Sequence, residues 1–161
     1  FATAAVQAAE YTMISVPKLR SPWFNDLEDG VKKAGADFGI AEVYPQAPAS
    51  ADEAQQVRII EDAISQGVNA IMVVPNDANS CVPAFARARA AGIAVMTHES
   101  PNQPEADYDV EMIDNVKFGE HAMKTFVQDM GTEEGEYVVF VGSLTVPAHN
   151  IWADAAIAYA K

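Results

Sequence analysis

The chain has 161 residues, of which 50% are hydrophobic, so it can bury the core of one domain or of one domain and part of another. Its 10 Lys and Arg residues against 23 Asp and Glu residues give a formal net charge of −13, which repels phosphate backbones and argues against nucleic-acid binding. No apolar run approaches the ~20 residues that span a bilayer, so we expect no membrane insertion.

The amino-terminal residues are small and apolar. They include the run Ala5-Val6-Gln7-Ala8, which has the small-residue pattern of a signal-peptidase site. We interpret residues 1–10 as the remnant of a signal peptide or as a disordered tail. The first interpretation predicts a secreted protein of the periplasm.

Between residues 11 and 97, four short β-prone runs alternate with three stretches of helical periodicity. Ser21 and Pro22 supply an N-cap and a first-turn proline for the first helix, and residues 50–53 form a capping box for the second. The predicted strands cover residues 11–16, 40–44, 70–74 and 93–97, and the predicted helices cover residues 21–39, about 50–67 and about 80–91.

This alternation is typical of a parallel sheet with helices on both faces, because parallel strands need crossover connections and these are right-handed. The fold class is therefore α/β, with a doubly wound parallel sheet. We predict the strand order 2-1-3-4 and assign residues 11–98 to a first lobe.

The pattern changes after this lobe. Residues 99–107 are polar and contain Pro101 and Pro104, which predicts a hinge or linker rather than a helix. In residues 108–161 we predict a second lobe with a short strand at 108–113, a helix at 116–130, a strand at 137–141 and a helix from 147. These elements cannot cover both faces of a sheet, so the second lobe is predicted to be incomplete.

Polar and aromatic residues follow the predicted strands, at the sheet edge where ligands of open α/β folds bind. After the first strand, Lys18 offers a donor to hydroxyl groups, and Trp23 either offers a flat apolar surface or covers the sheet edge. The next residue, Phe24, is either a second aromatic contact or part of the core. After the third strand, Asn76 and Asp77 either bind hydroxyls or cap the loop.

After the fourth strand, His98 and Glu99 form either a general acid–base pair or a hydrogen-bonding site for neighbouring hydroxyls. The sequence leaves that choice open. The three histidines have no metal-ligand spacing, Cys81 is the single cysteine, and there is no phosphate-binding glycine motif or nucleophile elbow. We therefore expect neither a metal nor a cofactor.

Four stretches resemble the type I periplasmic sugar-binding proteins of ABC transporters, which include ribose, rhamnose and autoinducer-2 binders. They are residues 21–24 (S-P-W-F) with the helix behind them, residues 67–71 (G-V-N-A-I), residues 113–116 (I-D-N-V) with Gly119, and residues 143–152, which are similar to an S-L-T-x-x-x-x-N-x-W segment. The resemblance spans nearly the whole chain. It implies a two-lobed clamp about twice this length, of which this chain is the amino-terminal half.

The resemblance also implies a function. A small sugar-like ligand would be held between the lobes and delivered to the permease of an ABC transporter, by a protein that is not an enzyme; we expect it to be a monomer. Lys18 matches a family lysine, and Trp23 and Phe24 match ring-stacking aromatics. Glu99 stands where the family usually has a hydroxyl-binding Asp, and Asn150 stands where ribose-type binders have an Arg.

Two departures from the family weaken an autoinducer assignment: the Glu at position 99, and Ala148-His149 in place of Asp-Gln. We predict that one cleft between the lobes is formed by Lys18, Trp23, Asn76, Glu99, Asp114 and Asn150.

Two alternatives stay open. One is the ligand-sensing core of a transcriptional repressor, which shares the clamp. The other is a flavodoxin-like or isomerase-type enzyme that uses His98 and Glu99.

Overall fold

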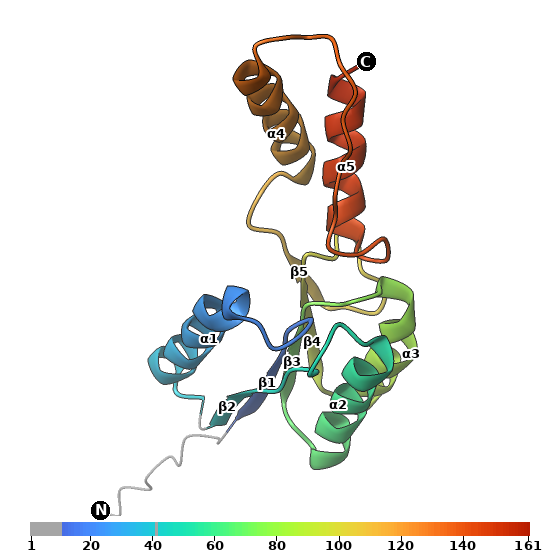
Figure 1. Cartoon of the computed structure of the whole chain (residues 1–161). Helices are drawn as coiled ribbons and strands as arrows, with labels where there is room; N and C mark the ends of the chain where they lie inside the picture. Colours follow the sequence, from blue (N-terminus) through green and yellow to red (C-terminus); the bar gives the residue numbers. More distant parts are fainter. Residues whose placement is uncertain (1–10, 41) are drawn as a thin grey trace, which may run out of the picture.

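The computed structural model describes residues 11–40 and 42–161, so the signal peptide expected in residues 1–10 lies outside the described residues. Five strands form one parallel sheet in the order β2-β1-β3-β4-β5 (Figure 1). The predicted α/β class and the order of the first four strands are confirmed. The strands are β1 (Thr12–Val16), β2 (Glu42–Pro45), β3 (Ala70–Val73), β4 (Ala94–His98) and β5 (Tyr108–Val110).

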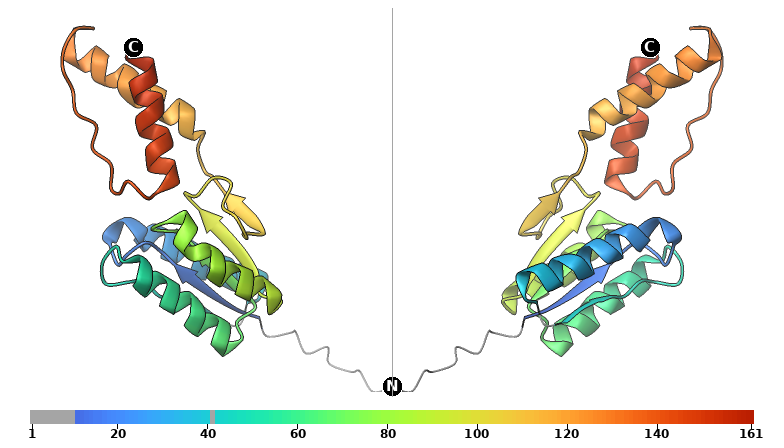
Figure 2. Two further views of the ribbon diagram at one scale, coloured as in Figure 1. Left: turned by 90° about the vertical axis from the view of Figure 1, so that its right-hand side faces the viewer. Right: turned by 90° about the vertical axis from the view of Figure 1, so that its left-hand side faces the viewer.

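Helices cover both faces of this sheet. The helix α1 (Asn25–Phe38), preceded by the 3-10 turn η1 (Pro22–Phe24), lies on one face, and α2 (Glu53–Gln66) and α3 (Ala78–Ala90) lie on the other (Figure 2). Ser21 caps η1 as predicted, by accepting a hydrogen bond from the backbone N–H of Trp23.

The capping box predicted at residues 50–53 is wrong in detail. The side chain of Asp52, and not that of Ser50, accepts a hydrogen bond from the backbone N–H of Gln55 at 2.8 Å. The reason is that Asp52 is the last residue with extended backbone before α2 begins, which is where a capping oxygen reaches the first turn.

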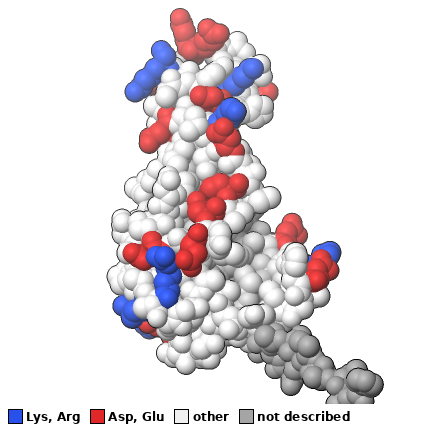
Figure 3. Space-filling view, turned by 180° about the vertical axis from the view of Figure 1, so that it is seen from behind, with Lys and Arg blue, Asp and Glu red and all other residues white. Residues whose placement is uncertain are grey.

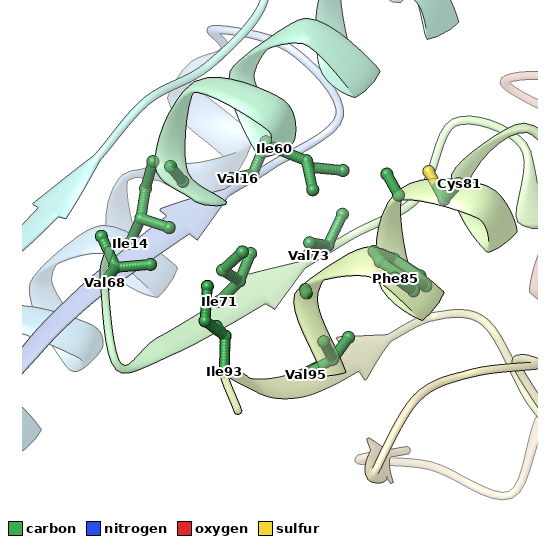
Figure 4. Packing of buried hydrophobic residues seen from close by; sticks show 13 residues of the cluster. Ile14, Val16, Ile60, Val68, Ile71, Val73, Cys81, Phe85, Ile93 and Val95 are labelled. Carbon is green, nitrogen blue, oxygen red and sulfur yellow. The ribbon is translucent and has the colours of Figure 1, made fainter. Parts of the chain in front are cut away.

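The hydrophobic core lies between the sheet and the helices α2 and α3 (Figure 4). Alternate strand residues such as Ile14, Ile71 and Val95 point into it, and Ile60 and Phe85 meet them from the two helices. The strands are therefore fixed in register by this packed face, and their carboxyl ends are held together at one edge.

The segment after β4 differs in part from the prediction. Residues 99–107 form turns and no helix, as their prolines indicate. They do not cross between lobes, however, because they fold back onto α3, where Gln103 Nε2 donates a hydrogen bond to the carbonyl oxygen of Ala78 at 2.8 Å. Arg89 of α3 pairs with two carboxylates of the same segment, Glu105 and Asp107.

The strand expected to open the second lobe belongs to the first sheet. β5 pairs in parallel with β4, and Thr97 Oγ1 donates a hydrogen bond to Asp109 at 2.9 Å across this pair. The free edge of β4 provided the hydrogen-bonding partners that β5 needs. The chain leaves the sheet only at residues 111–114.

Two helices beyond the sheet, α4 (Asn115–Met130) and α5 (Pro147–Tyr159), pack side by side and form what we call the α4–α5 body (Figures 1 and 2). The strand predicted at residues 137–141 does not form. An extended segment becomes a strand only beside a partner strand, and no described strand pairs with it. Its Phe140 side chain is 91% exposed.

Acidic side chains are spread over the face shown in Figure 3, from the sheet to the far tip of the α4–α5 body, and Lys and Arg side chains lie beside several of them. The net charge of −13 is thus distributed along the molecule, a surface that disfavours polyanions. Among the helices of residues 11–40 and 42–161, none is long and apolar enough to cross a membrane.

Replacing Phe85 by Ala should lower the free energy of unfolding by about 3–5 kcal/mol, because the ring is fully buried between α3 and the sheet. The matched control is Phe38→Ala, which removes a ring that is 81% exposed and should change stability by less than about 0.5 kcal/mol. Urea unfolding followed by circular dichroism measures both. Equal losses in the two variants would contradict the assignment of the core.

Candidate functional site

A buried ion pair joins the ends of two strands. Lys18 follows β1 and Glu99 follows β4, and Lys18 Nζ donates a hydrogen bond to Glu99 Oε2. Only 7% of the lysine side chain and 15% of the glutamate side chain are exposed. Glu99 also has a φ of 55°, in the left-handed region, which a non-glycine residue occupies only where its surroundings hold it there.

The loops that carry these charges are held by one buried amide. Gln56 of α2 is fully buried, and its Nε2 donates hydrogen bonds to the carbonyl oxygens of Pro17 at 3.2 Å and Val74 at 2.9 Å. Its Oε1 accepts a hydrogen bond from the backbone N–H of Asn76 at 2.8 Å. Asn76 Nδ2 in turn donates to the carbonyl oxygen of Lys18 at 2.7 Å, so the loops after β1 and β3 form one rigid unit.

The α4–α5 body reaches this unit through the segment before α5. Thr145 Oγ1 donates a hydrogen bond to the carbonyl oxygen of Asn76 at 2.7 Å, and the adjacent Val146 is buried. Ala148, in the first turn of α5, is also fully buried. The amino-terminal end of α5 therefore lies against the carboxyl edge of the sheet, where Figure 1 places it.

His149, in this first turn of α5, lies near the ion pair. Its Nδ1 is buried and has no hydrogen-bond partner, and a Cβ added at Gly142 would come within 2.9 Å of the ring. Burial lowers the pKa of His149, the nearby ammonium group of Lys18 lowers it further, and the carboxylate of Glu99 opposes both effects. The unpartnered Nδ1 lies on the side of Gly142, where an added Cβ would be 3.4 Å from it, and contact with the backbone of Ser143 also opposes the lowering of the pKa.

The aromatic residues of the first loop separate into two roles. Trp23 is 78% exposed, so its ring is free to contact a ligand, whereas Phe24 is buried in the first lobe. Of the two readings of Phe24 that the sequence left open, its position favours a packing role.

Three polar residues of the predicted set make local hydrogen bonds. Asp77 caps α3 by accepting from the backbone N–H of Ser80 at 2.7 Å, and Asp114 caps α4 by accepting from that of Lys117 at 3.1 Å. Asn150 Nδ2 donates to the carbonyl oxygen of Leu144 at 2.9 Å. The structure thus brings Lys18, Asn76 and Glu99 into direct contact, while these three side chains stabilise the turns and helices around them.

Sequence reasoning missed Gln56, Thr145 and His149. A signal for Gln56 was present, because it lies four residues before the buried Ile60 on the inward face of α2. A polar residue on such a face needs buried partners. Thr145 and His149 carry no comparable signal, since only the docking of α5 brings them to the sheet edge.

The arrangement is suited to binding rather than to acid–base chemistry. His98 Nδ1 is engaged with the carbonyl oxygen of Val110 at 2.6 Å, its Nε2 stays 4.0 Å from Glu99 Oε1, and Glu99 is already paired with Lys18. Within the part of the chain that the structure describes, no group of His, Cys, Asp and Glu residues could hold a metal ion.

The lowered pKa of His149 predicts a loss of stability in weak acid. The free energy of unfolding is fully retained above the pKa of an unfolded histidine, about 6.5, and falls as the pH drops below it, because the unfolded chain takes up the proton first. Urea unfolding at several pH values should show this decrease in the parent and a smaller one in His149→Gln. His121→Gln, which changes an exposed histidine of α4, is the control and should keep the parent slope. The prediction is wrong if His149→Gln also keeps it.

Known proteins of one kind match this chain. A family model described as a periplasmic binding protein domain matches residues 12–161. The ribose import binding protein RbsB of Bacillus subtilis is 30% identical over 123 residues, which cover 76% of this chain and 40% of that protein. The D-ribose/D-allose-binding protein of Pseudomonas aeruginosa is 33% identical over 91 residues, which cover 54% of this chain and 28% of that protein.

Solved structures show the same architecture. An ABC transporter solute-binding protein from Clostridium phytofermentans with bound L-rhamnose has a TM-score of 0.83 and 25% identity, over 94% of this chain and 47% of that one. One from Burkholderia graminis in complex with D-arabinose also has a TM-score of 0.83, with 24% identity over 96% of this chain and 53% of that one. The chain thus spans about half the length of these proteins or less. By its sequence and its fold, it belongs to the periplasmic binding protein family.

Proposed function

We propose that this chain provides the first lobe and the hinge side of the second lobe of a solute-binding protein. The complete protein captures a small sugar between its lobes in the periplasm and delivers it to an ABC transporter permease, without chemical conversion. The observation that carries the proposal is the Lys18–Glu99 pair, buried at the ends of β1 and β4. Support comes from the solute-binding proteins that this chain resembles.

The chemistry of the pair suits a sugar. A hydroxyl group both donates and accepts, so neighbouring hydroxyls can donate to the Glu99 carboxylate and accept from the Lys18 ammonium group. The two opposite charges leave no net charge at the centre of the site, which favours a neutral ligand over a sugar acid or a sugar phosphate. Bonds to charged partners are the stronger ones, which helps to replace the water that a sugar loses on binding.

Other residues complete the proposed site. Trp23 is exposed in the loop that also carries Lys18, and in this proposal it offers an apolar surface to the C–H face of the ring. His149 lies close enough to Lys18 and Glu99 for their charges to act on it, and its neutral imidazole can exchange a hydrogen bond with a hydroxyl group. In this proposal Asp77, Asp114 and Asn150 act mainly by fixing the helices and turns that surround the ligand.

Replacing Glu99 by Gln should weaken sugar binding by about 2 kcal/mol, roughly 30-fold, because the charged acceptor is lost. Isothermal titration calorimetry with D-ribose, D-allose, L-rhamnose and D-arabinose measures the effect. The control Glu120→Gln removes an exposed carboxylate of α4 and should bind like the parent. Because Glu99→Gln leaves Lys18 buried without a counter-charge, the double variant Lys18→Met/Glu99→Gln shows whether a loss of folding is responsible. If the double variant unfolds like the parent and still binds as tightly, the assignment of the pair fails.

Replacing Trp23 by Ala should weaken binding of the same sugars by about 1–2 kcal/mol and leave the free energy of unfolding within about 0.5 kcal/mol of the parent, because the ring is exposed. Titration calorimetry and urea unfolding on the same preparation separate the two effects. Unchanged affinity would remove Trp23 from the site.

A second experiment tests whether the protein converts the sugars. Nuclear magnetic resonance of each sugar after incubation with the protein should show no product, and conversion of any of them would contradict a pure binding role.

A further inference from the structure

Three side chains connect the sheet to both helices of the α4–α5 body. The carboxylate of Glu111 accepts hydrogen bonds from the backbone N–H of Ser100 at 3.0 Å and from Asn115 Nδ2 at 2.7 Å. Trp152 Nε1 donates to Asn115 Oδ1. We call Glu111, Asn115 and Trp152 the hinge relay, because Glu111 follows β5, Asn115 opens α4 and Trp152 lies in α5.

The chemistry of the relay allows one arrangement only. A carboxylate accepts and never donates, and an indole nitrogen donates and never accepts. The side chain between Glu111 and Trp152 must therefore donate on one side and accept on the other, as the amide of Asn115 does. An aspartate at this position would face Glu111 with a second negative charge.

The two helices of the body are locked to each other at the same place. A Cβ added at Gly119 would collide with the backbone oxygen of Trp152 and lie 2.8 Å from the Cβ of Ala155, so α4 and α5 approach closely there. The ring of Phe118 packs against that of Trp152 with centroids 5.0 Å apart. A change in the position of Asn115 therefore moves both helices together.

Trp152 also links the relay to the candidate site. Its ring centroid lies 5.0 Å from that of His149, one helical turn earlier in α5, and His149 is close enough to Lys18 and Glu99 for their charges to act on it. Within the described chain, residues 111–114 are the one covalent connection between the sheet and the body. The orientation of the body is otherwise set by hydrogen bonds and packing.

We propose that Glu111, Asn115 and Trp152 are positioning residues, which fix the angle between the α4–α5 body and the sheet and thereby hold the first turn of α5 against the sheet edge that carries the Lys18–Glu99 pair. None of the three needs to touch a ligand for this role. The fixed angle is a property of the chain itself, and its consequence for sugar affinity rests on the proposed function.

Distances between two spin labels test the angle directly. Labels on Arg58→Cys of α2 and Lys124→Cys of α4 use two exposed positions on the two sides of the hinge. Cys81 does not compete for the label, because it is buried and its pKa is raised to about 12, chiefly by burial. Pulsed electron paramagnetic resonance should give one narrow distance distribution in the parent.

Asn115→Ala and Trp152→Phe should both broaden or shift this distribution, and the second variant keeps an aromatic ring in the packing between α4 and α5. Gln128→Ala removes another amide side chain of α4, which is exposed, and should leave the distribution unchanged. Asn115→Asp, which places a second carboxylate opposite Glu111, should also broaden or shift it. If Asn115→Ala and Trp152→Phe both give the parent distribution, the relay does not fix the angle.

The same variants test the consequence for binding, with D-ribose as the probe. Trp152→Phe should weaken its binding by about fivefold, the loss of one net hydrogen bond. An altered distance with unchanged affinity would show that the relay sets the angle but does not position the site. If the parent binds none of the tested sugars, the proposed function fails, while the distances still decide the role of the relay.

Discussion

One buried amide organises the edge of the sheet on which the candidate site is built. Gln56 is fully buried, and a polar group in such a place is costly unless its hydrogen bonds are made. It satisfies the carbonyl oxygens of Pro17 and Val74 and the N–H of Asn76, which belong to two different loops. The parallel strands bring the loops after β1 and β3 to the same edge of the sheet. The hydrogen bonds of Gln56 then hold both loops in a fixed conformation.

The ion pair above this edge serves binding better than it serves stability. Removing two charges from water costs free energy that their attraction returns only in part, so a buried pair is weak support for a fold. Lys18 and Glu99 are nevertheless almost fully buried, and Glu99 holds a left-handed backbone conformation as well. Strain and desolvation gathered at one place are typical of a functional site. A ligand that bonds to both charges would recover part of the cost.

The hinge connects two bodies, the sheet with its helices and the α4–α5 body, each of which is closely packed. The sheet with its helices is held by a continuous apolar core, and α4 and α5 are held by the close approach at Gly119. Between them lie the short connection at residues 111–114, the hydrogen bond from Thr145 to Asn76 and the hinge relay. The angle between the two bodies therefore depends on these few polar contacts rather than on a continuous apolar core.

The sequence by itself determined the α/β class, the first four strands and their order, because local periodicity and the right-handed crossover rule leave few alternatives. It also placed Lys18, Asn76 and Glu99 at the same sheet edge, since each of them directly follows a strand. Only the tertiary structure decided that residues 108–110 extend the first sheet and that residues 137–141 do not form a strand, because pairing depends on which edge is free nearby. Only the docking of α5 brought His149 to the ion pair and Trp152 to the hinge, because contacts between residues far apart in sequence leave no local pattern to read.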